Sequence, residues 1–226
     1  MRLQRKPEAA VAGHYLETYR LVRRQAAGFR LPSVTEISAE NDPYLVLVSC
    51  ILSLRTKDNV ALEASRRLFA QADGPRAMLG LTEKKIAGII FPVGFYRTKA
   101  GVILGASRLI LERFGGLVPR TQEELLSIKG VGRKTANLVL GLGYGIPAIC
   151  VDVHVHRVSN RLGWVSTHKV EETEAGLQKL FPRRYWIELN TVIVAFGQNI
   201  CRPVSPHCGS CAAAALCRKA GVGKSR

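Results

Sequence analysis

The sequence predicts an all-α protein. Apolar residues recur at helical spacing over much of the chain, whereas the alternating pattern of half-buried strands is scarce. Glycine and proline fall between the apolar segments and leave short connections, which is typical of packed helices. A length of 226 residues allows one large domain or two small ones, each with its own core.

Six segments carry the helical pattern: 45–54, 60–72, 81–90, 99–114, 169–181 and 185–196. The first is a compact apolar stretch that suits a buried helix. The fourth has an apolar stripe, made of Val102, Ile103, Ala106, Leu109 and Ile110. Near Pro147 the chain leaves one apolar helix and enters another, so we expect it to cross between domains there.

The chain is strongly basic. Lysine and arginine number 33 against 17 aspartates and glutamates, which leaves a net charge of +16. A hydrophobic fraction of 47% excludes wholesale disorder. The excess charge predicts a polyanionic partner, and nucleic acid is favoured over a membrane surface. No apolar run is long enough to span a bilayer and the N-terminus leads into no apolar signal segment, so we expect a cytoplasmic protein, associated with the nucleoid if the cell is prokaryotic.

The six cysteines fall into two groups. Cys50 and Cys150 have apolar neighbours, which predicts two buried free thiols. The other four crowd into 17 residues: Cys201, Cys208, Cys211 and Cys217. This crowding predicts one metal site rather than disulfides or a chance grouping, and thiolates select zinc or iron–sulfur. Because only one C-x2-C pair is present, the spacing leans toward an iron–sulfur cluster without excluding zinc.

The most informative stretch, 121–142, predicts a helix, a glycine hairpin and a second helix. Thr121 and Glu124 have the spacing of a capping box, so the first helix is expected from about residue 122 to 127. Glycines suit the turn, and the second helix is expected over about 133–142. Such a hairpin exposes backbone N–H groups that bind phosphate, although an ordinary helix–helix corner is the alternative. The residues expected to face DNA here are Lys129, Gly130, Val131, Gly132 and Arg133.

Lys134 lies in the first turn of that second helix, where the positive end of the helix dipole disfavours a cation. One interpretation is a further phosphate contact. The other is a nucleophilic amine, whose ammonium form is destabilised by the dipole, by Arg133 and by partial burial, and which could form a Schiff base. The residues themselves leave both interpretations open.

Asp152 is the second catalytic candidate. It follows an apolar segment, so we expect it to be partly buried, and it is also a favoured N-cap for a helix expected over 153–162. Both roles are compatible, because a capping carboxylate stays ionised. His154 and His156 cannot face the same way, so we assign His154 to a possible pocket and His156 to solvent or DNA.

Three motifs, in this order, resemble the endonuclease III family, the bifunctional branch of the helix-hairpin-helix DNA glycosylase superfamily. They are KGVGRKTAN at 129–137, VDVH at 151–154 and the cysteine spacing C-x6-C-x2-C-x5-C. The similarity covers residues 43–217, most of the chain.

The resemblance implies a two-lobed fold with a DNA cleft between the lobes. Residues 36–146 would form a six-helix barrel domain that contains the helix-hairpin-helix, and residues 1–35 and 147–226 would together form an iron–sulfur cluster domain. A 4Fe-4S cluster would be bound by Cys201, Cys208, Cys211 and Cys217. One active centre needs no second copy, so a monomer is expected.

The resemblance also implies the chemistry of base excision DNA repair. A damaged base in double-stranded DNA, expected to be an oxidised pyrimidine, would be flipped out of the duplex. Lys134 would attack the sugar C1′, release the base and form a Schiff base, and β-elimination would then cut the strand as an abasic-site (AP) lyase does. Asp152 would stabilise the cationic sugar and help to move protons.

Two further segments match the family less closely. In 52–58, Arg55 stands where the family usually has the glutamine that fills the gap left by the flipped nucleotide. Arginine could stack on bases and bind the orphaned partner base, with guanine favoured by its acceptor edge. Asp58 is expected to help line the base pocket, or else to be an ordinary surface carboxylate.

The segment 94–100 resembles the family's second DNA-facing loop. Phe95 is the candidate wedge and Lys99 a candidate DNA contact, although Phe95 as plain core is the alternative. Two smaller departures from the family are Lys129 in place of proline and Val153 in place of threonine.

Two other functions stay open at this point. One is a glycosylase of the same superfamily that prefers mismatched or deaminated bases. The other is a non-catalytic helix-hairpin-helix module that only binds DNA.

Overall fold

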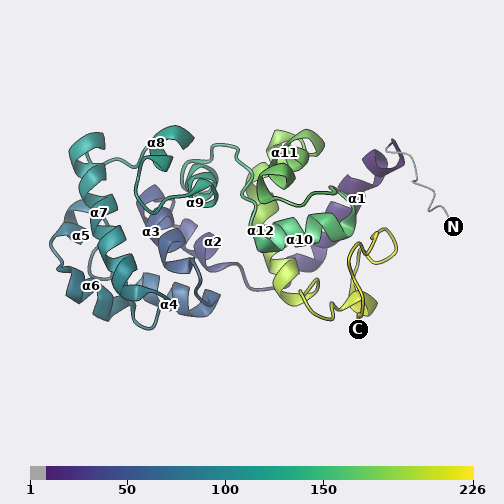
Figure 1. Cartoon of the computed structure of the whole chain (residues 1–226), viewed down its shortest axis with the longest axis horizontal. Coiled ribbons are helices and arrows are strands. Elements are labelled where there is room, and N and C mark those ends of the chain that lie inside the picture. Colours follow the sequence, from purple (N-terminus) through teal and green to yellow (C-terminus); the bar gives the residue numbers. More distant parts are fainter. Residues whose placement is uncertain (1–8) are drawn as a thin grey trace. The chain divides into compact units, whose positions relative to one another are not determined.

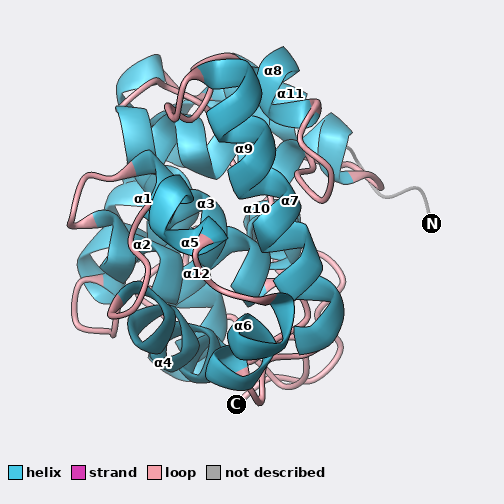
Figure 2. Cartoon of the chain, turned by 90° about the vertical axis from the view of Figure 1, so that its left-hand side faces the viewer, coloured by secondary structure: helices cyan, strands magenta, loops and turns pink. Residues whose placement is uncertain are grey.

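The computed structural model describes residues 9–226, with side chains from His14 onward. Within this range all regular secondary structure is helical, which confirms the all-α prediction (Figure 2). The chain divides into two compact units. Residues 31–148 form one, called here the continuous unit, and residues up to 30 with 149–226 form the other, called here the discontinuous unit.

The helices of the continuous unit are α2 (Ser33–Ser38), α3 (Pro43–Ser53), α4 (Asp58–Phe69), α5 (Pro75–Leu79), α6 (Glu83–Ile90), α7 (Tyr96–Phe114), α8 (Gln122–Leu126) and α9 (Arg133–Leu138), drawn in blue and teal in Figure 1. A π-helical turn over Val139–Gly143 continues α9. The second hairpin helix, expected over 133–142, is therefore α-helical in its first half and wider in its second.

Helix α3 is the centre of the continuous unit. Asp42 caps it, since its Oδ1 accepts a hydrogen bond from the Tyr44 N–H at 2.7 Å. Every residue from Tyr44 to Leu52 is buried, because α2, α4, α7 and α9 pack around the helix. A helix that is apolar on all sides must lie inside its domain, as the sequence predicts.

The discontinuous unit joins the two ends of the described chain. Its helices are α1 (Ala9–Ala26), α10 (Val153–Leu162), α11 (Val170–Leu180) and α12 (Trp186–Asn199), with 3-10 turns at Arg183–Tyr185 and Cys208–Ser210. Helix α1 packs on α12, and Tyr19 contributes to an aromatic cluster with Trp164 and Phe181, whose ring centroids lie 5.1 Å apart. Helix α1 has no counterpart among the expected segments.

The boundaries of the two units fall at 30/31 and 148/149, whereas the sequence interpretation places them at 35/36 and 146/147. The first boundary moves because α2 packs on α3 and α4. Asp58, the first residue of α4, accepts hydrogen bonds from the Ser33 N–H and hydroxyl. Among the described helices, none is both long and apolar enough to span a bilayer.

Candidate active site and cysteine cluster

The predicted hairpin is formed by α8, a tight turn and α9. The Thr121 hydroxyl caps α8 by accepting from the Glu124 N–H at 3.3 Å. In the turn, the Val131 N–H donates to the Ile128 carbonyl at 3.0 Å, and Gly130 has a left-handed φ of +89°. Val131 is buried, so its side chain anchors the hairpin. The exposed members of the predicted DNA-facing set are Lys129, Gly130, Gly132 and Arg133.

Lys134 is half-buried at the second position of α9. Gly132 is the N-cap of this helix, so no side chain caps the first turn. Cys50, on α3, lies within electrostatic reach of Lys134: burial raises the pKa of the Cys50 thiol to about 12, and the charge of Lys134 lowers it. The buried Cys50 thiol and the Lys134 side chain are therefore close enough to interact electrostatically, an arrangement that sequence reasoning missed.

Asp152 performs the predicted capping role. Its Oδ1 accepts hydrogen bonds from the N–H groups of His154 and Val155, each at 2.9 Å, and the side chain is half-buried. These bonds fix the orientation of the carboxylate at the start of α10. The carboxylate is thus held at the N-terminus of α10.

His154 is the second residue of α10, two positions after Asp152, and its ring packs toward Gly197 of α12. The Arg157 guanidinium lies 3.1 Å from His154 Nδ1 and also donates to the Gly197 and Cys201 carbonyls. Because arginine can only donate, Nδ1 is the acceptor of this hydrogen bond. Asp152 and His154 belong to the discontinuous unit, whereas Lys134 and the hairpin belong to the continuous unit.

Arg55 and Phe95 lie together on two neighbouring loops of the continuous unit. Both have left-handed backbones, with φ of 51° and 58°, and the Arg55 Cζ lies 5.7 Å from the centre of the Phe95 ring. Phe95 is 62% exposed, so the core alternative is wrong, and its role as a wedge stays a prediction. A left-handed backbone costs a non-glycine residue about 1–2 kcal/mol, so the surrounding structure must stabilise both loops.

The expected role of Lys99 as a surface DNA contact does not fit its position. The side chain is only 6% exposed, and burial lowers its pKa to about 8. Its Nζ donates to the carbonyls of Leu52 at 2.8 Å and Leu54 at 2.5 Å. The sequence could have indicated this burial, because Lys99 shares a helix face with Ile103 and the rest of the apolar stripe.

Both carboxylate oxygens of Asp58 accept hydrogen bonds from Ser33, so this side chain has a structural role. Oδ2 accepts from the Ser33 N–H at 3.0 Å and Oδ1 from the Ser33 hydroxyl at 2.7 Å. The carboxylate thereby joins α2 to α4. Its place in a base pocket stays a prediction.

The four clustered cysteines line one small cavity of the discontinuous unit, together with apolar side chains such as Phe196 and Ile200. Burial raises the pKa of the Cys211 and Cys217 thiols, and the neighbouring cysteines raise it further. Among the described residues, no group of three or more His, Cys, Asp or Glu side chains is arranged to hold a single metal ion. The four thiols thus face a common space without closing around one point.

Two side chains that sequence reasoning missed hold the cysteine loop. Arg161, on α10, is buried and donates to the Arg202 carbonyl at 2.6 Å and to the Cys201 sulfur at 3.7 Å. Gln25, on α1, donates to the Ser210 carbonyl and accepts from the Ala212 N–H. Arg157 and Arg161 share a helix face, and that spacing could have indicated that both donate hydrogen bonds to the same segment.

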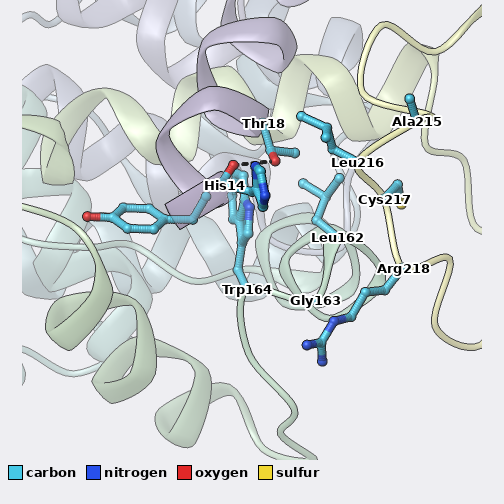
Figure 3. Close-up of a pocket in the computed structure, with 10 residues that line it drawn as sticks. His14, Thr18, Leu162, Gly163, Trp164, Ala215, Leu216, Cys217 and Arg218 are labelled. Atoms are coloured by element: carbon cyan, nitrogen blue, oxygen red, sulfur yellow. Dashed lines mark hydrogen bonds between the residues drawn. The ribbon is translucent and has the colours of Figure 1, made fainter. Parts of the chain in front are cut away.

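A second cavity of about 390 Å³, which shares Leu162 and Cys217 with the cysteine cavity, lies between α1, the end of α10 and the 215–218 segment (Figure 3). It is lined by His14, Tyr15, Thr18, Leu162, Gly163, Trp164, Ala215, Leu216, Cys217 and Arg218. None of these is a predicted catalytic or DNA-facing residue. This cavity is therefore distinct from the residues expected to act on DNA.

A glycine hairpin between two helices, followed at once by a half-buried lysine, is an arrangement of helix-hairpin-helix DNA repair proteins. The family model described as HhH-GPD superfamily base excision DNA repair protein matches residues 48–183. Endonuclease III of Thermotoga maritima is 46% identical over 172 residues, which cover 76% of this chain and 81% of that protein. The chain belongs to the endonuclease III family of this superfamily.

Solved structures agree with this assignment. A trapped covalent intermediate of endonuclease III with DNA, an estranged-adenine complex, matches at 35% identity and a TM-score of 0.74, covering 79% of this chain and 84% of that one. A non-covalent endonuclease III–DNA complex matches at 30% identity and a TM-score of 0.81, covering 92% and 95%. The chain spans 48% to 63% of the plant and vertebrate relatives it matches. Family membership confirms the predicted function of a base excision repair enzyme, a DNA glycosylase and AP lyase.

Proposed function

We propose that this enzyme removes oxidised pyrimidines from double-stranded DNA, as a monomer, through a Schiff base formed by Lys134. The observation that carries the proposal is the position of Lys134, half-buried in the first turn of α9 directly after the glycine hairpin. The solved covalent intermediate supports it, because a 35% identical relative was trapped bonded to DNA. An amine gives such a bond with an aldehydic sugar carbon.

The chemistry uses the lysine twice. Its neutral amine attacks C1′, and the base leaves with the electrons of the glycosidic bond and takes up a proton. The amine then loses a proton, the C1′–O4′ bond breaks as O4′ takes up a proton, and an imine forms at C1′. This imine acidifies the C2′ proton, whose removal expels the 3′ phosphate and cuts the strand.

Asp152 supplies the negative charge in this proposal. The departing base leaves a sugar with oxocarbenium-like positive charge, and a carboxylate stabilises it. The two bonds from the N–H groups of α10 hold Asp152 in one orientation, so it is ready before the substrate binds. It would also carry protons to and from the departing base and C2′.

The hairpin and the two exposed loop residues would bind the duplex. Lys129, Gly132 and Arg133 are exposed at the turn, where backbone N–H groups and cations suit a phosphate. Arg55 and Phe95 would fill the space left by the flipped nucleotide, with Arg55 on the orphaned base. We also propose that the enzyme is cytoplasmic, and that it is associated with the nucleoid if the cell is prokaryotic.

We further propose that Cys201, Cys208, Cys211 and Cys217 hold a 4Fe-4S cluster, which makes the discontinuous unit the cluster domain and the continuous unit the helical barrel. All four thiols line one cavity, yet they are not gathered as a single ion needs. The proposal is supported by the cavity that the four thiols share and by membership of the endonuclease III family, and the cluster would stabilise the fold of this loop when bound.

Borohydride trapping tests the central proposal. An imine on abasic DNA is reduced to a stable covalent adduct, visible as a shifted band. We expect the adduct with the wild type and none with Lys134→Ala. Lys129→Met, which removes a cation at the turn, is the matched control and should still trap at saturating DNA. An adduct that persists in Lys134→Ala would refute Lys134 as the nucleophile. A separate panel of lesion-bearing duplexes identifies the base that the enzyme prefers.

A further inference from the structure

Lys99 connects the two loops that carry Arg55 and Phe95. Its Nζ donates to the Leu52 carbonyl, the Leu54 carbonyl and, at 3.1 Å, the Thr56 hydroxyl. These three acceptors are alternate residues of the segment in which Arg55 has its left-handed backbone. An ammonium has three N–H donors, so each finds one acceptor in this segment.

The same residue reaches the second loop through its backbone. The Lys99 N–H donates to the Phe95 carbonyl at 3.0 Å. The Thr56 hydroxyl oxygen extends the link, because it also accepts from the Gly94 N–H at 3.3 Å. The two loops touch at this point, since a Cβ on Gly94 would lie 2.5 Å from the Arg55 carbonyl oxygen.

We propose that Lys99 is a positioning residue that fixes the Arg55 and Phe95 loops in the geometry that enters duplex DNA. This inference rests on the proposed function, because it concerns the residues that fill the gap in the duplex. Nζ is buried and its partners are uncharged oxygens, so the ammonium binds protein rather than phosphate. Residues held in place before binding lose less conformational entropy on insertion.

The test compares Lys99→Met with Lys84→Met. Methionine keeps the length of the buried stem but donates no hydrogen bond, and Lys84 is an exposed lysine of α6 whose replacement removes the same charge. On a lesion-bearing duplex we expect kcat/KM of Lys99→Met to fall at least tenfold. On single-stranded abasic DNA, which has no gap to fill, borohydride trapping should stay within twofold of the wild type. Lys84→Met should stay within twofold on both substrates.

A double-mutant cycle with Arg55→Ala separates positioning from a general loss of structure. If Lys99 acts through the Arg55 loop, Arg55→Ala should cost less than twofold further in the Lys99→Met protein, although it costs more in the wild type. Additive losses would overturn the proposal, as would equal losses on duplex and single-stranded DNA.

If Lys99→Met does not fold, Thr56→Val takes its place. Valine keeps the shape of threonine but removes the hydroxyl that binds both Lys99 Nζ and the Gly94 N–H. It should show the same loss confined to duplex DNA, and unchanged duplex activity would refute the proposal. A wild type that traps no abasic DNA at all would instead refute the proposed function, so the two failures are distinguishable.

Discussion

Gly130 packs so closely against Val102 that a Cβ at position 130 would lie 2.6 Å from the Val102 Cγ1. The contact joins the hairpin turn to α7, the helix that also carries Lys99. Two independent features therefore disfavour any side chain at position 130, because the same glycine also has a φ of +89°. The hairpin is held in place by contact with α7 as well as by its own turn.

Gly130→Ala should lower the free energy of unfolding by about 1–3 kcal/mol, the cost of a strained backbone with a close contact added. Gly132→Ala is the matched control, since Gly132 has an ordinary φ of −99° and open space around the position of a Cβ. It should change the free energy by less than about 0.5 kcal/mol. Urea denaturation of both variants measures the difference, and equal stabilities would contradict the packing argument.

Asp152→Asn should separate capping from catalysis. Asparagine caps helices as well as aspartate does, so the unfolding free energy should change little. The loss of the charge should lower the single-turnover rate about 100-fold or more, as expected when a group that stabilises transition-state charge is removed. Asp152→Ala should lose the rate and also about 1 kcal/mol of stability. An Asn variant with the wild-type rate would show that the carboxylate serves only as a cap.

Arg55 should set the preference for the base opposite the lesion. A guanidinium that binds the guanine acceptor edge discriminates by about 1–3 kcal/mol, so lesions opposite guanine should be cut roughly tenfold faster than those opposite adenine. Arg55→Gln should reduce this difference. Single-turnover rates with the same lesion opposite each of the four bases measure it, and an unchanged order of preference in the variant would assign the selectivity elsewhere.

The burial of Lys99 predicts a pH dependence of stability. Its pKa falls from the ordinary value of 10.5 to about 8 in the folded protein. Between these values the unfolded chain holds a proton that the folded chain has released, so this residue makes the unfolding free energy rise with pH across that window. Lys99→Met should lose the rise and Lys84→Met should keep it. Urea denaturation at pH 7.5, 9 and 10.5 compares the slopes, and identical slopes would contradict the prediction.

Removal of one clustered cysteine should remove the proposed cluster. The purified wild type should be yellow-brown and contain iron and acid-labile sulfide in equal amounts. Cys208→Ala should lose colour and stability, whereas Cys150→Ala, at a buried thiol outside the cluster, should keep the colour. Zinc without iron in the wild type would contradict the assignment.

Features that depend on neighbours in the sequence were predictable. Thr121 and Asp152 cap their helices through N–H groups two or three residues away, and the glycine turn closes over a similar distance. The same holds for the apolar run of α3, whose composition requires burial on all sides. Short-range patterns are sufficient here because the interacting groups are fixed by the chain itself.

The sequence by itself determined the all-α class, the hairpin with its lysine and the cysteine cluster, since each is encoded within a few dozen residues. Only the tertiary structure decided that Lys99 is buried while Phe95 is exposed, although the two are four residues apart. Lys99 meets the Leu52 carbonyl 47 residues away, and α1 packs on α12 at the other end of the chain. Which side chain a fold covers depends on such long-range contacts, and no local pattern specifies them.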